Sequence, residues 1–384
     1  LLYKKQMTFD EHISFIETNY FENLKILFHE NNFIKYINPY AIHTLNLAKI
    51  RNFLLACVEE KFKKTKLKSK PYKLVLDPTN GCNLGCPLCP TGIGASSRKK
   101  GVLKIEQFLQ IIDQFKEYVI EVHLYNWGEP TLNKKLNEML AHCRKNNLWT
   151  RISSNLSLNL KDEFLKDMVE SGLDLLHVDI DGMDQEVYVK YRKKGNLDQV
   201  MSNLKKIIEI KKRNNQKTPV LELAMLAMKQ NEHQHKDFLD LKNQLDVEVV
   251  RIDKMQHNPN MDTSWLPENK DLIYSSYEES GGKGASHSAT NDIKSPCHWP
   301  WSGIVVNYDG GVNPCCLVDD PKADFDNIYE KPIEEIWNSE KYISSRSEFT
   351  DQKEITVNTI CNVCKNETHS KRLNRVEGSF AIKI

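Results

Sequence analysis

Residues 77–91 read DPTNGCNLGCPLCPT and place three cysteines, Cys82, Cys86 and Cys89, within one short loop. Glycine and proline surround these cysteines, and both residue types prevent a continuous helix and let the backbone fold back on itself. Three thiolates can therefore converge on one centre. The preceding residues 72–77 (YKLVLD) alternate like a β-strand. We expect the loop to follow the first strand of a sheet, where α/β enzymes carry their chemistry.

Strand and helix patterns alternate from residue 72 to about residue 255. The predicted strands are 72–77, 121–125, 150–153, 175–180, 220–227 and 247–252. The predicted helices between them are 105–118, 134–146, 161–171, 197–213 and 233–245. Repeated βα units form a parallel sheet, and six of them give an open partial barrel and not the closed eightfold one. The sequence therefore predicts an α/β fold.

The cysteine spacing, C-x3-C-x2-C, resembles the signature of the radical S-adenosylmethionine (SAM) enzymes. In that family three cysteines hold three irons of a [4Fe-4S] cluster, and the fourth iron binds the amino and carboxylate groups of SAM. Soft thiolates suit such clusters, and three of them leave one iron open. The resemblance implies that Cys82, Cys86 and Cys89 are cluster ligands, that SAM is a cofactor, and that the fold is a partial (β/α)6 barrel. It also implies an external electron donor, flavodoxin-like or ferredoxin-like. The alternative is a zinc loop or three structural cysteines.

Two strand ends carry further parts of the resemblance. Gly128, Glu129 and Pro130 follow the second predicted strand and are similar to the family's Gly-Gly-Glu-Pro motif, which binds the SAM amino group. Backbone carbonyls and a carboxylate supply the acceptors that an ammonium needs. Ser153 and Asn155 end the third strand, where relatives place polar residues near the SAM ribose. Without this context the Gly-Glu-Pro segment would be an ordinary turn.

The fourth predicted strand ends in Asp181-Gly, and Arg192 follows eleven residues after Asp181. Family members have a similar segment, in which the arginine and a serine hold the SAM carboxylate. Arg192 fits that arginine, which is a suitable bidentate partner for a carboxylate. Asp179 replaces the serine and cannot donate to a carboxylate when ionised. The alternative roles of Asp181 and Arg192 are a strand-end cap and a surface ion pair.

A second cysteine group lies near the C-terminus. The group begins at Cys297, which is followed after twelve residues by Gly310 and after four more by Cys315. The pair Cys361 and Cys364 comes later in the chain. The C-x12-G-x4-C element, with a hairpin-like NYDGGVNPCC, resembles the SPASM and twitch domains that follow the radical SAM core in a large subfamily. The four cysteines would ligate one auxiliary [4Fe-4S] cluster completely. The alternative is a zinc knuckle, because four thiolates also satisfy tetrahedral zinc.

Other residues near this group complete the comparison. Asn327, Trp337 and Arg346 fall in a GN…iW…R pattern similar to that of SPASM domains, with Asp326 in place of the glycine. Cys316 remains outside the ligand set. It is a candidate alternative ligand, a small buried residue, or a thiol that donates a hydrogen atom to a substrate radical.

The resulting domain prediction has four parts: an N-terminal helical segment (1–70), the partial barrel (71–255), a connector (256–295) and an auxiliary cluster domain (296–384). The connector is expected because residues 275–295 are rich in glycine and serine and have no periodicity. Asp253, Lys254 and His257 follow the sixth strand and are candidates for contacting the substrate at the open face, although solvated loop residues are common at such positions.

Composition sets broad limits on function. Lys and Arg (53) nearly balance Asp and Glu (52), so net charge gives no sign of a polyanionic partner, and we expect no nucleic-acid partner. No apolar run reaches the roughly 18 residues of a membrane span, and the first residues lack a signal-peptide pattern. We therefore expect a cytoplasmic protein. Ten cysteines in that compartment favour metal or redox chemistry over disulfides.

The resemblance implies an oxidoreductase that generates a 5′-deoxyadenosyl radical from SAM and removes a hydrogen atom from its substrate. The resemblance implies, as first choice, oxidation of a carbohydrate or another alcohol, because relatives with one auxiliary cluster include such dehydrogenases. Cross-linking or epimerisation of a ribosomal peptide is the alternative, so the expected substrate is a small molecule or a peptide. A zinc-stabilised binding scaffold without SAM chemistry is the alternative from another class.

Overall fold

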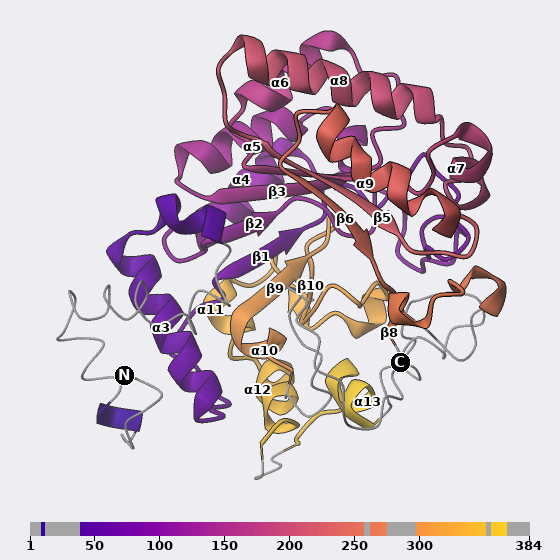
Figure 1. Ribbon diagram of the computed structural model, residues 1–384. Helices are drawn as coiled ribbons and strands as arrows, with labels where there is room; N and C mark the ends of the chain where they lie inside the picture. Colours follow the sequence, from indigo (N-terminus) through magenta and orange to yellow (C-terminus); the bar gives the residue numbers. More distant parts are fainter. Residues whose placement is uncertain (1–8, 12–38, 257–261, 275–296, 351–354, 367–384) are drawn as a thin grey trace.

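The computed structural model describes residues 9–11, 39–256, 262–274, 297–350 and 355–366 (Figure 1). Its centre is a nine-stranded sheet with the order β11-β10-β9-β1-β2-β3-β4-β5-β6. All neighbours from β1 to β6 are parallel. These strands are β1 (Lys73–Leu76), β2 (Glu121–His123), β3 (Trp149–Ser154), β4 (Leu175–Asp179), β5 (Val220–Leu226) and β6 (Val249–Asp253). The six predicted strands and their order are confirmed, and the sheet is open at β6.

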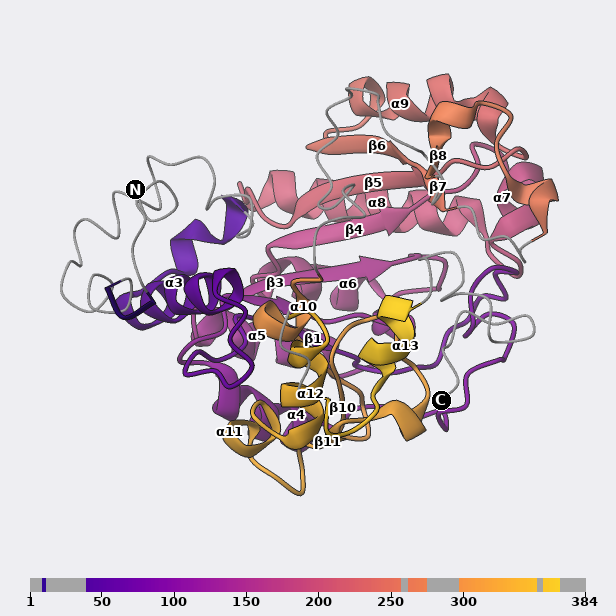
Figure 2. The same cartoon turned by 90° about the horizontal axis from the view of Figure 1, so that it is seen from below.

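The connections between the strands are helical, as predicted. The helices are α4 (Ile105–Phe115), α5 (Leu136–Lys145), α6 (Asp162–Glu170), α7 (Gln185–Tyr191), α8 (Leu197–Arg213) and α9 (His235–Gln244). Seen from below, they form a layer along one face of the curved sheet (Figure 2). The helix α7 was not predicted from sequence. It is short, and its N-terminus is capped by the Asp184 side chain, which accepts from the Val187 amide at 2.8 Å.

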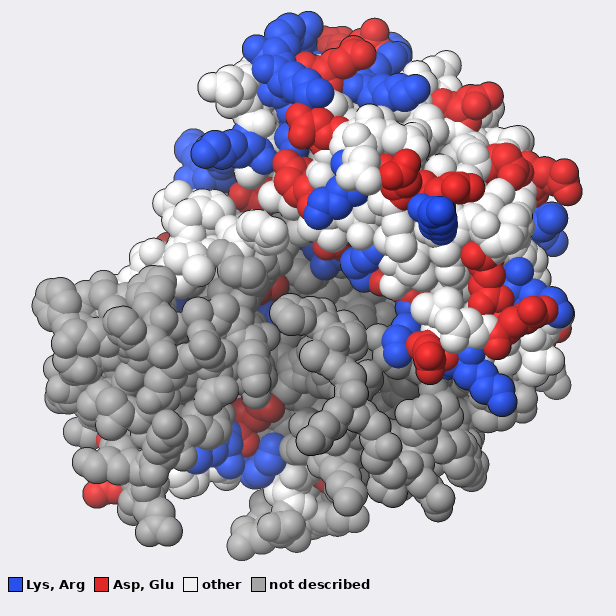
Figure 3. All heavy atoms as spheres, in the orientation of Figure 1, with Lys and Arg blue, Asp and Glu red and all other residues white. Residues whose placement is uncertain are grey.

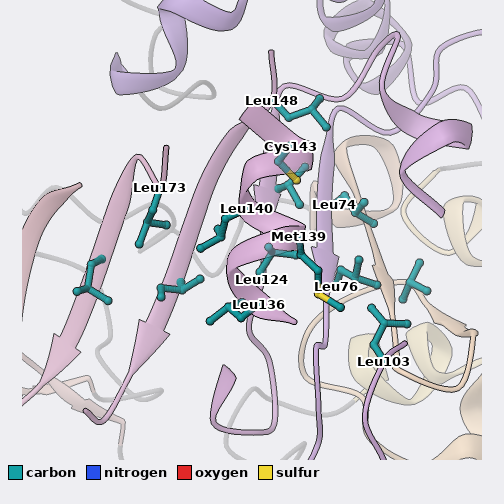
Figure 4. Close-up of a cluster of buried hydrophobic side chains, with 14 of the residues drawn as sticks. Leu74, Leu76, Leu103, Leu124, Leu136, Met139, Leu140, Cys143, Leu148 and Leu173 are labelled. Atoms are coloured by element: carbon teal, nitrogen blue, oxygen red, sulfur yellow. The ribbon is translucent and has the colours of Figure 1, made fainter. Parts of the chain in front are cut away.

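The main core lies between the helices and one face of the sheet. Figure 4 shows Leu136, Met139 and Leu140 of α5 directed toward Leu76 of β1 and toward Leu124, which follows β2. All five side chains are fully buried. Successive residues of a strand point to opposite faces, so the alternate residues of these strands point away from this core. That face carries charged side chains on β3 to β6 and borders the site described below.

The C-terminal cysteine region extends the same sheet. β9 (Gly303–Val306) pairs in parallel with β1 and antiparallel with β10 (Gly311–Asn313), which pairs with β11 (Asp326–Asn327). The predicted hairpin is therefore confirmed. Sequence did not show that its first strand covers the edge of β1, which would otherwise expose unpaired backbone groups. The helices α10 (Trp299–Ser302), α11 (Ile333–Ile336), α12 (Glu340–Ser347) and α13 (Ile360–Asn366) complete this region beside β1 (Figures 1 and 2).

The described N-terminal residues are helical up to Lys61, whereas residues 62–70 of the predicted helical segment form turns and bends. The short 3-10 helix η1 (Pro39–Thr44) precedes α3 (Leu47–Lys61), whose Phe53 ring packs edge-on against Tyr72 with centroids 5.0 Å apart. The following segment reaches the C-terminal region, where Asn338 bonds both the amide and the carbonyl of Leu67 at 2.9 and 2.8 Å. Among the described residues no helix is long and apolar enough to span a membrane. Figure 3 shows basic and acidic side chains interspersed on the visible face of the barrel.

Arg98 joins the cysteine-loop side of the barrel to the C-terminal hairpin. Its guanidinium lies 2.7 Å from Asp309 and 2.5 Å from Asp324, and its side chain is 1% exposed. Replacing it by methionine leaves two carboxylates without their partner. We expect Arg98→Met to lower the free energy of unfolding by about 2 to 3 kcal/mol, because charge-assisted buried bonds are lost. Urea denaturation followed by tryptophan fluorescence measures this. Lys116→Met removes an exposed pair with Asp113 and should change little.

Candidate active site

The three cysteines of the predicted cluster site lie together at the C-terminal end of β1. Burial raises the pKa of Cys82 to about 11 and of Cys86 to about 12, and the neighbouring thiols, including Cys89, add to both shifts. Thiolates therefore form here only beside a compensating positive charge, which bound iron would supply. The Leu84 amide donates to the Cys82 sulfur at 3.4 Å, and the Asn155 amide group lies 3.9 Å from it. Such bonds support metal-bound sulfur. The donor set fits a [4Fe-4S] cluster.

The Gly-Glu-Pro turn after β2 packs directly on the cysteine loop. A Cβ added to Gly128 would lie 1.8 Å from the Thr79 carbonyl oxygen, so only glycine allows this approach. The Glu129 amide donates to the Gly81 carbonyl at 2.8 Å. Pro130 begins the 3-10 helix η2 (Pro130–Leu132). The predicted neighbourhood of the two segments is therefore present in the structure.

The Glu129 carboxylate ties the ends of β2 and β3 together. It accepts hydrogen bonds from the Thr131 amide (3.1 Å) and hydroxyl (2.6 Å), the Ser154 hydroxyl (2.7 Å) and the Asn155 amide (2.8 Å). These four donors occupy most of its acceptor capacity. The carboxylate therefore links the turn after β2 to the end of β3. A direct contact with the SAM amino group stays a prediction, and so does a contact of Ser153 or Asn155 with the ribose.

Asp181 and Arg192 form an ion pair, but it is buried and not the surface pair that the sequence allowed: the Asp181 side chain is 0% exposed and that of Arg192 is 15% exposed. The Arg192 Nε lies 2.5 Å from Asp181, and its Nη2 lies 3.5 Å from Asp179. Asp181 also accepts from the Leu226 amide at 2.8 Å, so it links β4 to β5. Burial raises the pKa of Cys86, and the positive charge of Arg192 partly offsets that shift, which places the guanidinium near the cysteine loop. The predicted contact of Arg192 with the SAM carboxylate stays a prediction.

Sequence reasoning missed a charged network on the second face of the sheet. Glu222 Oε1 lies 2.6 Å from His177 Nδ1, 3.1 Å from Arg151 Nη2 and 3.0 Å from Arg251 Nη2. Arg251 also contacts Asp253. A signal was present, because polar residues alternate with apolar ones in strands that parallel sheets usually make apolar on both faces. This face therefore carries charged side chains that pair with one another across β3 to β6.

Tyr125 extends this network toward the second cysteine group. Its ring stacks on His123 with centroids 5.7 Å apart and lies 5.8 Å from the Arg151 guanidinium. Burial raises the pKa of Tyr125, and the nearby Cys316 adds to this shift. Cys316 therefore lies near the charged face, although its role stays a prediction. The Trp127 indole also donates to the Val318 carbonyl at 3.2 Å, so the loop after Cys316 touches the turn after β2.

The remaining substrate candidates lie at the end of β6 and directly after it. Asp253 shares its strand face with Arg251, and Ser153 donates to Asp179 at 3.2 Å on the same face of the sheet. Burial raises the pKa of Asp253, and Arg251 offsets part of the shift. Lys254 follows directly and is half-buried. His257 lies outside the described residues.

The position of His177 predicts a pH dependence of stability. Burial would lower its pKa, but the carboxylates of Asp179 and Glu222 raise it from 6.5 to about 9. The folded state thus binds this proton more tightly than the unfolded state does. We expect a stabilisation that is complete below pH 6.5 and is lost as the pH rises through 9. Thermal midpoints should therefore fall over this range.

Two variants test this assignment. His177→Gln should flatten the decline of the thermal midpoint between pH 6.5 and 9.5. His123→Gln is the matched control on the same face, since burial lowers the pKa of His123 and its titration lies below this window. If the thermal midpoint of the His177 variant fell with pH as steeply as that of the wild type, the assignment would be wrong.

The second cysteine group also converges. Burial raises the pKa of Cys315, and Cys316, Cys361 and Cys297 add to the shift. Burial raises the pKa of Cys361 to about 12, with further contributions from Cys364 and Cys297 and opposing hydrogen bonds from Ser345 and Thr359. The four predicted ligands therefore lie near one another and near Cys316, and their role as ligands stays a prediction. Within the described ranges, no three His, Cys, Asp or Glu side chains are arranged to hold a single metal ion. Four thiolates are a ligand set that fits a [4Fe-4S] cluster.

Comparison with known protein families agrees with both sites. Residues 76–241 match the model of the radical SAM superfamily, and residues 297–365 match SPASM, an iron–sulfur cluster-binding domain. The first match contains the cysteine loop, the Gly-Glu-Pro turn and Arg192. The second match contains all four predicted auxiliary ligands.

Curated relatives are distant. The tungsten-containing aldehyde ferredoxin oxidoreductase cofactor-modifying protein of Pyrococcus furiosus is 22% identical over 299 residues, which cover 70% of this chain and 81% of the relative. The PqqA peptide cyclase of Bradyrhizobium diazoefficiens is 24% identical over 190 residues, which cover 49% of this chain and 47% of the relative. The chain thus spans about half the length of this second relative.

Solved structures share the fold. Streptococcus suis SuiB bound to its precursor peptide SuiA has a TM-score of 0.57 and 16% identity, covering 99% of this chain and 92% of that chain. SuiB bound to S-adenosylmethionine has a TM-score of 0.57 and 14% identity, covering 94% of this chain and 91% of that chain. The chain therefore belongs to the radical SAM superfamily, binds a [4Fe-4S] cluster and SAM in its barrel, and carries a C-terminal SPASM domain for an auxiliary iron–sulfur cluster.

Proposed function

We propose that this enzyme oxidises a carbohydrate or another polar alcohol by two electrons. The observation that carries the proposal is the charged face of the sheet, where Glu222 joins His177, Arg151 and Arg251. Arg151 and Arg251 are partly exposed and carry more N–H donors than their bonds to Glu222 use, so this face favours a substrate rich in hydroxyl or amino groups.

The cofactors and the protein divide the work. When bound, the first cluster and SAM supply a 5′-deoxyadenosyl radical that removes a hydrogen atom, and the auxiliary cluster supplies a one-electron acceptor. Two-electron oxidation of a CH–OH group also releases one proton. Asp253 is the proposed acceptor of this hydroxyl proton, because burial raises its pKa and it lies at the end of β6. Arg251 beside it orients the carboxylate.

The proposal is tested with anaerobic enzyme that holds both clusters, dithionite, SAM and a panel of sugars, amino sugars and their nucleotide derivatives. We expect one compound to give a ketone or aldehyde in equal amount to 5′-deoxyadenosine. Asp253→Asn should lower oxidation of this compound about 100-fold or more, the usual scale for a general base, while the first cluster still forms. Product formation at the normal rate in this variant would contradict the role of Asp253.

Radical modification of a ribosomal peptide is the second candidate. It is supported by the similarity to PqqA peptide cyclase and to SuiB, which was solved with a precursor peptide. A short precursor reading frame beside the gene, and a mass change of that peptide in the same assay, would favour it. Failure of every sugar in the panel together with such a change would overturn the first proposal.

A further inference from the structure

Arg346 on α12 is a fully buried cation beside the auxiliary cysteines. Its side chain is 0% exposed, and its guanidinium lies 4.4 Å from the Trp337 ring and 5.2 Å from the Tyr342 ring. The adjacent Ser345 bonds the Thr359 hydroxyl at 2.9 Å, and both hydroxyls lie at the Cys361 thiol. Arg346 thus lies between segments that carry two predicted ligands, because Ser345 contacts Thr359, just before Cys361, and Arg346 itself bonds Pro300, just after Cys297.

The hydrogen bonds of Arg346 go only to neutral groups. Nε donates to the Pro300 carbonyl at 2.8 Å, and Nη1 donates to the Thr65 carbonyl at 2.9 Å and the Asn338 side chain at 3.3 Å. Nη2 is buried and has no hydrogen-bond partner in the described part of the chain. A buried guanidinium normally has a carboxylate partner, because an uncompensated charge in the interior is costly.

No carboxylate of the described residues pairs with this guanidinium. Glu59 raises the pKa of Arg346 from a distance, but its oxygens accept from Lys68 and Ser69 instead. Burial dominates and lowers the pKa of Arg346 to about 9, while Cys361 opposes this shift. Tyr342 and Glu59 oppose the shift as well, and Cys361 is the predicted cluster ligand whose charge acts on Arg346. Arg98 is the contrasting case, with two carboxylates in contact.

We propose that Arg346 is the fixed counterion of the auxiliary cluster and raises its reduction potential. A [4Fe-4S] core with four thiolates carries about two units of negative charge, and one-electron reduction adds a third. A buried positive charge beside it favours the reduced state, because charges interact strongly where water is excluded. The inference concerns the cluster and does not depend on the proposed substrate.

The first test is a redox titration of the auxiliary cluster by electron paramagnetic resonance. A Cys86→Ala background removes the signal of the SAM cluster and leaves the auxiliary one. Arg346→Met should lower the potential by about 59 mV, a tenfold change in the one-electron equilibrium. Arg346→Lys keeps the charge and should retain most of the potential, and it serves if the methionine variant does not fold. A potential unchanged in the methionine variant, or lowered equally in the lysine variant, would overturn the proposal.

The second test needs no activity and no electron transfer. Thermal midpoints are measured for protein with and without iron–sulfur clusters. Arg346→Met should raise or leave unchanged the midpoint of the cluster-free protein, because an unpaired charge is removed, and should lower that of the loaded protein. Arg98→Met is the matched control and should lower both by the same amount. Equal effects of Arg346→Met on the two forms would show that Arg346 only packs between the two rings.

Discussion

Replacing Cys86 by alanine should abolish SAM cleavage while leaving the auxiliary cluster in place. The wild-type protein, reconstituted without oxygen, should hold about eight irons per chain. The Cys86→Ala variant should hold about four, because two thiols do not retain the first cluster. Release of 5′-deoxyadenosine with dithionite and SAM should fall to the level without enzyme. Iron analysis and chromatography of the nucleoside products measure both quantities.

Cys361→Ala is the matched control for this experiment. Both cysteines are buried and both have a raised pKa of about 12, so the two substitutions are comparable in size and environment. The Cys361 variant should also lose about half of its iron, yet it should keep the reductive cleavage of SAM. If it lost this cleavage as completely as the Cys86 variant, the assignment of two independent clusters would be wrong. Zinc in both sites would make all seven cysteines structural.

The local pattern of the sequence predicted the barrel and the cluster ligands because both are encoded within short segments. Each βα unit carries its own periodicity, so all six strands and five of the six barrel helices were found. The cysteines were found because their chemistry is specific even in an unknown fold. The helix α7 was missed because seven residues give too little periodicity to recognise.

Features that depend on distant contacts could not be predicted. The pairing of β9 with β1 joins segments more than 200 residues apart. It depends on the free edge that β1 presents in the folded sheet, which no local pattern of the sequence shows. The network around Glu222 likewise requires the register of β4, β5 and β6. Arg346 was recognised as part of a pattern, but its lack of a carboxylate partner is a property of the packed interior.

Replacing Gly128 by alanine should impair SAM cleavage more than other small changes near the cysteine loop. The added Cβ would lie 1.8 Å from the Thr79 carbonyl oxygen and 2.8 Å from that of Gly81, and both contacts are with backbone. The turn after β2 must therefore move away from the loop. A displacement of about 1 Å at a site that positions reacting groups costs about 100-fold in rate. We expect that loss in 5′-deoxyadenosine formation, with near-normal iron content.

Gly85→Ala is the control, because it adds the same methyl group to the cysteine loop itself. Its Cβ would meet no atom closer than 3.7 Å, in ordinary contact with Lys193. Its rate of SAM cleavage should therefore stay within about twofold of wild type, as for other changes that leave the geometry intact. Isothermal titration with SAM would separate weaker binding from slower cleavage. If Gly128→Ala bound and cleaved SAM normally, the turn would not need its close approach to the cysteine loop, and Glu129 would not position the site through it.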